Sequence, residues 1–392
     1  MTDDFLLPSN HASAFLPESA PLRRLPRAPG RSRPEGFVRD KFEGRALVYD
    51  AFWHDDRKRI LVVGPPPMTL GPLYKEARYF ALPSRTALKA SCFKSLSVMV
   101  TALAGAPEGT EQLKMHLGGA TYELVVQPNG SRALAGRRVL FTMSRDNELA
   151  WIREWAHYHA AVQGTDAIVF FDNGSTRYGV AEIAATLKSV AGIAHAAVLS
   201  WPYRYGATDP AVRTNPYYGL FLQIASMSVA LRRYGARAFG LLNCDIDELV
   251  ATPEGTTIYE LAHAARQGLV AMPGQFIEAL PSGDGTGGVY THRDFGSRRR
   301  DAAARLSSPR KWALDPSRAW VGGLGVHPYM HWIEGRPPFG KTVLPEVFYW
   351  HFRGINTNWK EARTDASGLR PEDVEVDARF AGVVESEAFR GE

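Results

Sequence analysis

Cysteine is scarce in this chain of 392 residues: only Cys92 and Cys244 are present, and neither belongs to a spacing typical of a zinc site or a disulfide framework. Both thiols are therefore expected to be reduced. No apolar run reaches the roughly 18–20 residues that a membrane-spanning helix needs. The N-terminus also lacks a basic patch followed by an apolar segment and a cleavage site, so no secretory signal is expected and a cytoplasmic location is predicted.

Acidic residues are also few near the N-terminus. Residues 21–45 carry seven arginines and one lysine against three acidic residues, interspersed with proline and glycine. Such a composition is typical of an unfolded segment, so residues 1–45 are predicted to form a disordered tail. Its positive charge is compatible with peripheral contact with anionic lipid headgroups at the inner face of the cell membrane; the alternative is a solvated, unstructured arm, and no nucleic acid is expected as a partner.

The rest of the chain divides into two patterns. Over residues 46–135, short apolar runs such as Ile60–Val63 and Tyr122–Val126 are followed by proline and glycine turns, which predicts a small β-rich domain of the β-sandwich type. Over residues 136–392, strands alternate with helices, as in folds with a mostly parallel sheet flanked by helices. The predicted fold class is therefore α/β, preceded by a β-rich domain.

Continuous apolar runs predict the buried strands of the second part, namely Val139–Thr142, Ala167–Phe171, Ala196–Leu199 and Phe239–Asn243. Between the first two, Trp151, Trp155, Tyr158 and Val162 recur at helical spacing until Gly164, which predicts a helix with a core-facing side. A further helix is predicted from about Pro216 to Tyr234.

Three acidic residues follow the last of these strands: Asp245, Asp247 and Glu248. In open α/β sheets, ligands bind outside the carboxyl ends of the strands. Three carboxylates packed there repel one another unless a cation is present, and Mg²⁺ or Mn²⁺ binds carboxylates together with substrate phosphates. An Asp-x-Asp site for a divalent ion and a diphosphate is therefore predicted, with Asp245 and Asp247 as ligands. The alternative is that this motif is a solvated loop.

The stretch from residue 141 to residue 250 resembles GT-A glycosyltransferases of the family 2-like and family 92 group. The matching elements, in order, are Asn147-Glu148, Trp151-Ile152, Glu154-Trp155, Tyr158-His159, Phe171–Ser175, Gln223 and Asp245–Leu249. The resemblance fades beyond Pro328 into a weaker match at His351–Arg353. It implies a GT-A fold and inverting, metal-dependent transfer from a nucleotide sugar, most often a uridine diphosphate sugar, to a glycan or glycolipid acceptor.

Carried over residue by residue, the resemblance implies that Asn147 and Glu148 lie beside the nucleotide. Asp172, followed by Asn173, would face the base or ribose. Lys311 fits a further element and would pair with the diphosphate; the alternative is a surface lysine. The chain departs from the family at Arg177, where an acid is usual, and this arginine could instead meet a phosphate or an acidic sugar.

Two histidines lie where GT-A enzymes return a histidine to the metal. They are His327, which matches the family better, and His351, and one of them is predicted as a further metal ligand. For each, the alternative is a histidine satisfied within the core.

An inverting transfer also needs a general base. Asp294 is predicted in that role, with Glu278 and Asp284 as alternatives. The Gly283–Gly288 loop is interpreted as a lid over the substrate or as a loop without function. Arg298–Arg300 is interpreted as a solvated charge run or as an acceptor phosphate site.

The predicted function is thus a glycosyltransferase of polysaccharide biosynthesis that moves one sugar to a glycan acceptor. Two alternatives differ in class. A strand ending in Asp245-Ile246-Asp247 also resembles the nucleophile motif of haloacid dehalogenase-like phosphatases, but the later GDxxxD-type element is missing. A non-catalytic carbohydrate-binding protein with a GT-A-like fold is the other.

Overall fold

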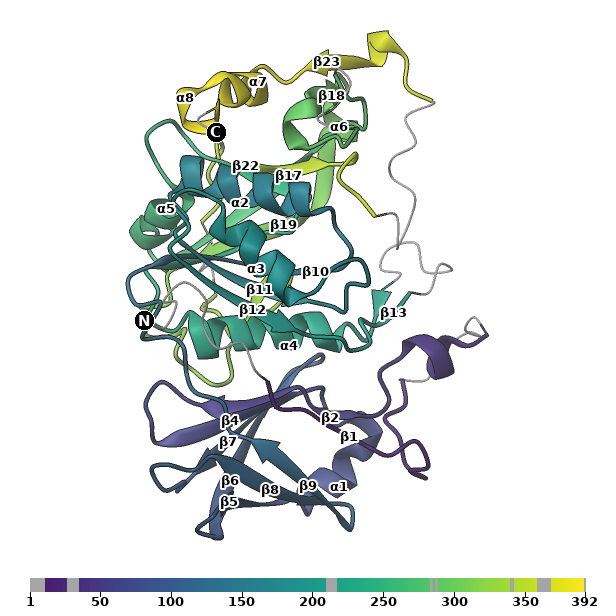
Figure 1. The fold of residues 1–392 in the computed structure, drawn as a ribbon, viewed down its shortest axis with the longest axis vertical. Helices are drawn as coiled ribbons and strands as arrows, with labels where there is room; N and C mark the ends of the chain where they lie inside the picture. The colour runs from purple at the N-terminus through teal and green to yellow at the C-terminus, as the bar shows by residue number, and fades with distance from the viewer. Residues whose placement is uncertain are drawn as a thin grey trace.

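The computed structural model describes residues 11–26, 35–208, 217–282, 285, 288–338, 342–357 and 368–390. Within these ranges the chain is a mixed α/β protein with two main sheets, one above the other in Figure 1. None of the helices in these ranges combines the length and the apolar character that a bilayer-spanning segment requires.

The larger sheet is mixed. In spatial order its strands are β12 (His195–Ser200), β11 (Ala167–Asp172), β10 (Arg138–Ser144), β15 (Gly240–Asn243), β19 (Leu306–Leu314), β17 (Leu269–Ile277), β22 (Phe348–Phe352) and β16 (Glu248–Ala251). The first four are parallel neighbours. β19 runs antiparallel to both β15 and β17, β17 is parallel to β22, and β22 is antiparallel to β16.

The parallel strands are apolar throughout because both faces of the sheet are covered. Alternate side chains enter different cores: Phe141 and Val169 pack on the side of helix α4 (Phe221–Val229), whereas Leu140 and Ile168 pack on the side of α2 (Leu149–Gln163) and α3 (Val180–Lys188). The predicted strands are therefore confirmed, the last one beginning one residue later, at Gly240.

The predicted core-facing side of α2 is also confirmed. Trp155 and Tyr158 are fully buried, and Trp151 is half-buried, with its indole N–H donating to the carbonyl of Tyr290. Gly164 ends the helix with a φ of 64°, a backbone conformation that glycine adopts without strain. The next predicted helix begins as α4 at Phe221 and continues as a π-helical turn, Ala230–Tyr234; Pro216 lies outside the described residues.

The remaining elements are short. The helices are α1 (Gly71–Lys75), α5 (Ile258–Ala264), α6 (Ala302–Arg305), α7 (Ala378–Glu385) and α8 (Glu387–Arg390). Paired short strands are β1 (Ala14–Phe15) with β2 (Ala46–Val48), β13 (Ala207–Thr208) with β14 (Tyr217–Tyr218), β18 (Ser297–Arg299) with β23 (Val374–Val376), and β20 (His327–Pro328) with β21 (Ile333–Glu334).

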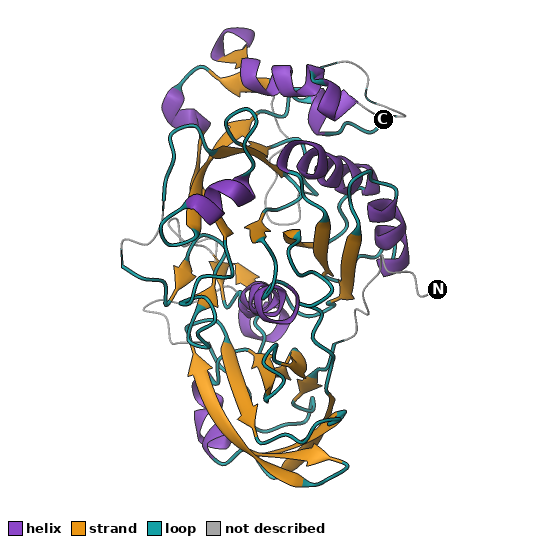
Figure 2. Cartoon of the chain, turned by 90° about the vertical axis from the view of Figure 1, so that its left-hand side faces the viewer, coloured by secondary structure: helices purple, strands orange, loops and turns teal. Residues whose placement is uncertain are grey.

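The β-rich part is a curled sheet whose strands pair in antiparallel fashion. Its order is β3 (Asp50–Trp53), β4 (Arg59–Gly64), β7 (Met99–Ala104), β6 (Thr86–Lys94), β5 (Arg78–Leu82), β8 (Gln112–Leu117) and β9 (Ala120–Val125). Helix α4 lies between this sheet and the larger one in both views (Figures 1 and 2). Leu61 and Val100 share a hydrophobic core with Phe221 of α4, so the two parts are packed together.

A buried ion pair also joins the two parts. Arg233 Nη1 lies 2.9 Å from Asp50 Oδ2, and the two side chains are 1% and 0% exposed. Asn129 donates to the carbonyls of both Trp53 and Arg232, at 2.9 and 3.1 Å. The polar contacts and the shared core therefore fix the β-rich sheet against α4.

The prediction that residues 1–45 form a disordered tail is wrong for residues 11–26 and 35–45. β1 pairs with β2, and Arg24 is fully buried. Its Nε donates to the carbonyl of Pro66 at 2.7 Å, and its guanidinium lies 5.8 Å from the ring centre of Phe221. Backbone carbonyls and an aromatic ring thus stabilise the buried guanidinium of Arg24, whereas composition alone predicted that it would be exposed to solvent. Residues 1–10 and 27–34 lie outside the described residues.

Candidate active site

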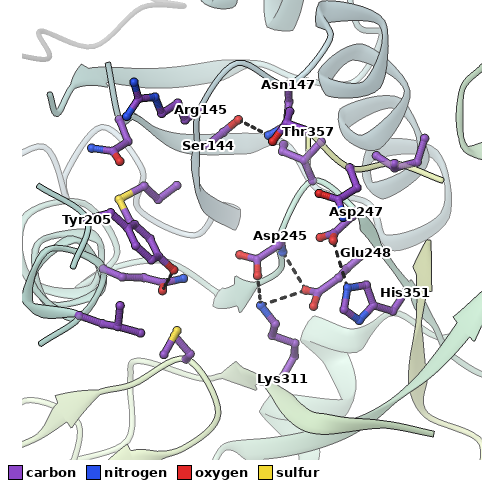
Figure 3. A pocket seen from close by; sticks show the side chains of 18 of the residues that line it. Ser144, Arg145, Asn147, Tyr205, Asp245, Asp247, Glu248, Lys311, His351 and Thr357 are labelled. Atoms are coloured by element: carbon purple, nitrogen blue, oxygen red, sulfur yellow. Dashed lines mark hydrogen bonds and ion pairs between the residues drawn. The ribbon is translucent and has the colours of Figure 1, made fainter. Parts of the chain in front are cut away.

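A polar pocket lies at the carboxyl ends of β10, β11 and β15. These strands are parallel, so the residues that follow them emerge at one edge of the sheet. β22 and β19 bring in further side chains. The polar lining consists of Ser144, Arg145, Asn147, Asn173, Tyr205, Gln223, Asp245, Asp247, Glu248, Lys311, His331, His351, Asn356 and Thr357 (Figure 3).

Lys311 is the centre of one charged cluster in this pocket. Its Nζ lies 2.6 Å from Asp245 Oδ2 and 3.0 Å from Glu248 Oε2, and Figure 3 shows it directed at both carboxylates. The backbone N–H of Asp245 donates to the same oxygen of Glu248, at 2.8 Å. The side chains of Lys311 and Glu248 are 2% and 3% exposed, whereas that of Asp245 is 35% exposed. Asp245 is therefore the member of the cluster that solvent reaches.

Burial and charge act against each other in this cluster. Burial raises the pKa of Glu248 to about 7, although the nearby ammonium of Lys311 opposes the shift. For Lys311, burial lowers the pKa, but the charges of Asp245 and Glu248 outweigh it and hold the pKa well above its usual range. The lysine therefore stays charged at neutral pH.

Asp247 belongs to a second cluster, together with His351. His351 Nε2 lies 3.0 Å from Asp247 Oδ2, and the other ring nitrogen, Nδ1, lies 2.9 Å from Ser307 Oγ. The imidazole stacks on Phe276 with a distance of 4.9 Å between ring centres. The backbone is fixed as well, because the N–H of Phe352 donates to the carbonyl of Asp247 at 2.8 Å.

The donor atoms of this second cluster suit a divalent cation. One ligand atom each from Asp247, Glu248 and His351 lie within 4.8 Å of one another. Carboxylate oxygens suit Mg²⁺ or Mn²⁺, an imidazole suits several transition metals, and such ions take their remaining ligands from water and substrate phosphates. Asp245, predicted as a ligand, lines the same pocket, but its carboxylate pairs with Lys311.

His327, the other histidine predicted as a ligand, is not among the residues that line the pocket. It lies in β20 with 1% of its surface exposed, and burial together with the charge of Arg232 lowers its pKa to about 4. The structure therefore brings together His351 and Asp247, and places His327 in the core.

The residues predicted to hold the nucleotide divide into two groups. Asn147 and Asn173 line the pocket: the first donates to Ser144 Oγ at 2.8 Å, and the second donates to two backbone carbonyls, those of Trp201 and Tyr203. These contacts fix both amides in the strand-end loops.

Glu148 and Asp172 lie outside the lining. Glu148 precedes the first turn of α2 and pairs with Arg177, so the arginine that departs from the family pattern meets a carboxylate of this chain. Asp172 accepts hydrogen bonds from the backbone and hydroxyl of Ser175, and burial raises its pKa.

Asp294, predicted as the general base, has a structural role in this fold. It is the last residue of the 3₁₀ turn His292–Asp294, and its Oδ2 accepts from the backbone N–H of Thr291 at 2.6 Å. The pattern Thr-x-x-Asp is a capping box in which the acid closes its own turn. Asp294 is also absent from the pocket lining.

The alternatives to Asp294 as the general base gain no support from the structure. Glu278 is buried and pairs with Arg299 and Arg353, and Asp284 lies outside the described residues. Arg298 and Arg300 both pair with Glu375 of the C-terminal strand β23, so within the described chain these two arginines share an acidic partner.

The pocket contains polar residues to which sequence reasoning gave no role. Arg145 and His331 are exposed at its rim, and the hydroxyl of Tyr205 donates to Gln223 Oε1 at 2.6 Å. Arg145 was recognisable in principle, since it lies three positions after the predicted strand Val139–Thr142. Tyr205 and His331 lie in loops whose path the sequence pattern does not reveal.

Two further stretches match letter patterns associated with nucleotide binding. Gly335–Thr342 matches GxxxxGK[ST], and Gly283–Gly288 matches GxGxxG. A functional match needs a strand before the pattern and a helix at its end. The first match follows the two-residue strand β21, and the described residues 342–347, which begin at its last position, are not helical. The second match precedes a single 3₁₀ turn. Both matches therefore lack the required structural context.

Comparison with protein-family models gives no match for this chain, and comparison with curated proteins gives none. The geometry of the pocket is therefore the basis for assigning a function to this chain.

Proposed function

We propose that the protein is a metal-dependent glycosyltransferase of the GT-A type, which moves a sugar from a nucleotide diphosphate donor to a glycan or glycolipid acceptor. The observation that carries the proposal is the pairing of Asp247 with His351 beside Lys311, at the edge of the sheet where three parallel strands end. Carboxylates and an imidazole in one pocket provide ligands for a divalent cation that could bind a diphosphate in turn, and the buried ammonium of Lys311 offsets part of the carboxylate charge.

In this proposal Asp247 and His351 hold a Mn²⁺ or Mg²⁺ ion, and one carboxylate oxygen of Glu248 lies within 4.8 Å of their ligand atoms. When bound, the ion supplies Lewis-acid stabilisation of the charge that develops on the departing diphosphate. Lys311 holds Asp245 and Glu248 in fixed positions. Arg145, exposed at the rim, and the amide of Asn147 are the donors proposed to bind the nucleotide side of the donor substrate.

The finer fold assignment belongs to the same proposal. Four parallel strands followed by an antiparallel region that returns a histidine to the pocket support a GT-A fold. The curled β-rich sheet is proposed as a sandwich-like module that positions the acceptor. Its shared core with α4 supports that role, because it fixes the module relative to the catalytic sheet.

Peripheral membrane contact through the basic N-terminal segment is also part of the proposal. Arg24 is buried, and Arg45 pairs with Glu18 at 2.9 Å, so these two cations already have partners within the chain. The arginines at positions 27, 31 and 33, outside the described residues, are the ones proposed to meet anionic headgroups of a membrane facing the cytoplasm.

One observation favours a second function. Lys311 pairs with two of the three carboxylates and offsets one of their negative charges, so the charge repulsion that motivated the metal prediction is partly relieved within the chain. A carbohydrate-binding protein that has kept the fold without turnover would need no more than this. Binding of glycans that is indifferent to metal and nucleotide would support it.

The test of the proposal is turnover. The protein is incubated with Mn²⁺ and a panel of uridine, guanosine and cytidine diphosphate sugars, and release of the nucleoside diphosphate is measured. The proposal predicts release from one nucleotide class, at least 100-fold less in Asp247→Ala, and unchanged release in the control His327→Gln, whose side chain lies outside the pocket. Release from no donor, with glycan binding retained, would favour the carbohydrate-binding protein.

A further inference from the structure

Ser307 is a buried polar residue to which neither the sequence nor the proposed function has given a role. Its side chain is in β19 with 4% of its surface exposed, and its Oγ lies 2.9 Å from His351 Nδ1. The same hydroxyl hydrogen-bonds the phenol of Tyr349, which is fully buried. A row of three side chains therefore leads from Tyr349 through Ser307 to the imidazole.

The local backbone is shaped to admit this row. Gly274 of β17 lies opposite Ser307 in the sheet, and the register between β17 and β19 shifts between Met272 and Gly274. A Cβ at position 274 would lie 2.5 Å from the Tyr349 hydroxyl and 2.7 Å from Ser307 Cβ. Only glycine leaves room here for Tyr349 and Ser307 to approach each other. The close approach of the strands at this glycine therefore allows the row of hydroxyl groups to form.

The chemistry of a hydroxyl suits both states of His351. With no cation, Nε2 faces a carboxylate oxygen of Asp247, which only accepts. The proton of the neutral ring then lies on Nε2, and Nδ1 accepts from Ser307 Oγ–H. With a cation on Nε2, the neutral ring carries its one proton on Nδ1, which must donate. A serine hydroxyl accepts as readily as it donates, and its own O–H then donates a hydrogen bond to the oxygen of Tyr349.

We propose that Ser307 is a positioning residue for the cation site of Asp247 and His351: its hydroxyl reverses direction between donor and acceptor, so that His351 stays in one place while its proton changes nitrogen. This inference rests on the metal site in the proposed function. A carboxylate at position 307 would fix the proton on Nδ1, and an alanine would leave Nδ1 without the contact in either state. A serine keeps the contact with His351 Nδ1 both with and without the cation.

The first measurement is Mn²⁺ affinity by electron paramagnetic resonance of the free ion, for the wild type, Ser307→Ala, Ser307→Thr and Ser228→Ala. Ser228 is the matched control, a fully buried serine outside the pocket. Loss of a residue that orients a metal ligand typically weakens metal binding about 10- to 100-fold, so Ser307→Ala should fall in that range. Ser307→Thr, which keeps the hydroxyl, and Ser228→Ala should bind within about threefold of the wild type.

The second measurement needs no variant. The ¹⁵N chemical shifts of the His351 ring report which nitrogen carries the proton, in the metal-free protein and with diamagnetic Zn²⁺ as the probe. The inference predicts a proton on Nε2 without the ion and on Nδ1 with it. Two results would overturn the role of Ser307 alone. One is equal Mn²⁺ binding by the wild type and Ser307→Ala, and the other is a His351 ring whose proton stays on Nε2 when Zn²⁺ is bound. Wild-type protein that binds no Mn²⁺ would overturn the metal site and this inference together.

Discussion

Lys311 and Asp245 form an ion pair of 2.6 Å, although 66 positions separate them in the chain. The lysine comes from antiparallel strand β19 and the aspartate from the loop after parallel strand β15. The first acid of the Asp-x-Asp motif therefore has a partner within the protein. The second, Asp247, pairs with His351 and belongs to the cation site proposed above. This division of roles between the two aspartates leads to predictions that differ for each residue.

Lys311→Met should destabilise the fold. The substitution leaves buried Glu248 without its counter-charge, and removal of one partner of a buried pair costs about 3 kcal/mol or more. Urea denaturation followed by tryptophan fluorescence measures the change in the free energy of unfolding. Lys58→Met, at an exposed position, is the control and should change it by less than about 0.5 kcal/mol. Equal stability of the two variants would mean that the buried cluster is not formed.

The two histidines should differ in metal binding. His351→Gln should lower Mn²⁺ affinity at least tenfold, because its Nε2 is one of the donor atoms grouped around Asp247. His327→Gln should leave the affinity unchanged, since its side chain is buried outside the pocket. Both affinities come from calorimetric titration of Mn²⁺. A loss in His327→Gln without a loss in His351→Gln would reverse the assignment.

Glu248→Gln should have a pH-dependent effect on stability. The pKa of Glu248 is raised to about 7 by burial, from an ordinary value of 4.5, so between these pH values the folded state binds more protons than the unfolded state. Its contribution to stability is full below about pH 4.5 and is lost as the pH rises through about 7. Glutamine does not titrate.

The difference in free energy of unfolding, variant minus wild type, should therefore increase from about pH 4.5 to about pH 7 and then level off. Comparison with the wild type at each pH removes the contributions of other groups, among them His327, whose lowered pKa acts in the opposite direction. A difference that stays constant over this range would show that Glu248 titrates normally.

Asp294→Asn should change stability and spare catalysis. The carboxylate closes the turn at Thr291, and loss of such a cap costs about 1 kcal/mol. The midpoint of thermal unfolding should fall by a few degrees, while nucleoside diphosphate release at saturating donor stays within about twofold. A fall in turnover of 100-fold or more at unchanged stability would restore Asp294 as the general base.

Much of the fold could be predicted from the sequence. Strands such as Ala167–Asp172 are buried on both faces, so their apolar runs are continuous, and the helix before Gly164 is amphipathic. These signals are local. The antiparallel half of the sheet was missed, because β19 and β17 carry polar residues such as Ser307 and Gln275 that interrupt the apolar pattern.

The candidate site was predicted in part for the same reason. Asp247 lies four positions after the predicted strand that ends at Asn243, and the parallel sheet fixes where that strand ends. The partner of Asp245 depends on strand pairing over 66 residues, which no local pattern encodes. Asp294 could have been assigned correctly, since Thr291 stands three positions before it and forms a capping box. The buried Arg24 could not, because its partners are backbone carbonyls.

The central claim is that Asp247 and His351 hold a cation that binds a nucleoside diphosphate. Calorimetric titration of UDP, GDP and CDP into the protein with Mn²⁺, then with a chelator, and again into Asp247→Ala, tests it most directly. The account predicts that one nucleotide binds with Mn²⁺, and that binding is lost with the chelator and in the variant. Binding of no nucleotide in any condition, or binding that depends on neither Mn²⁺ nor Asp247, would contradict it.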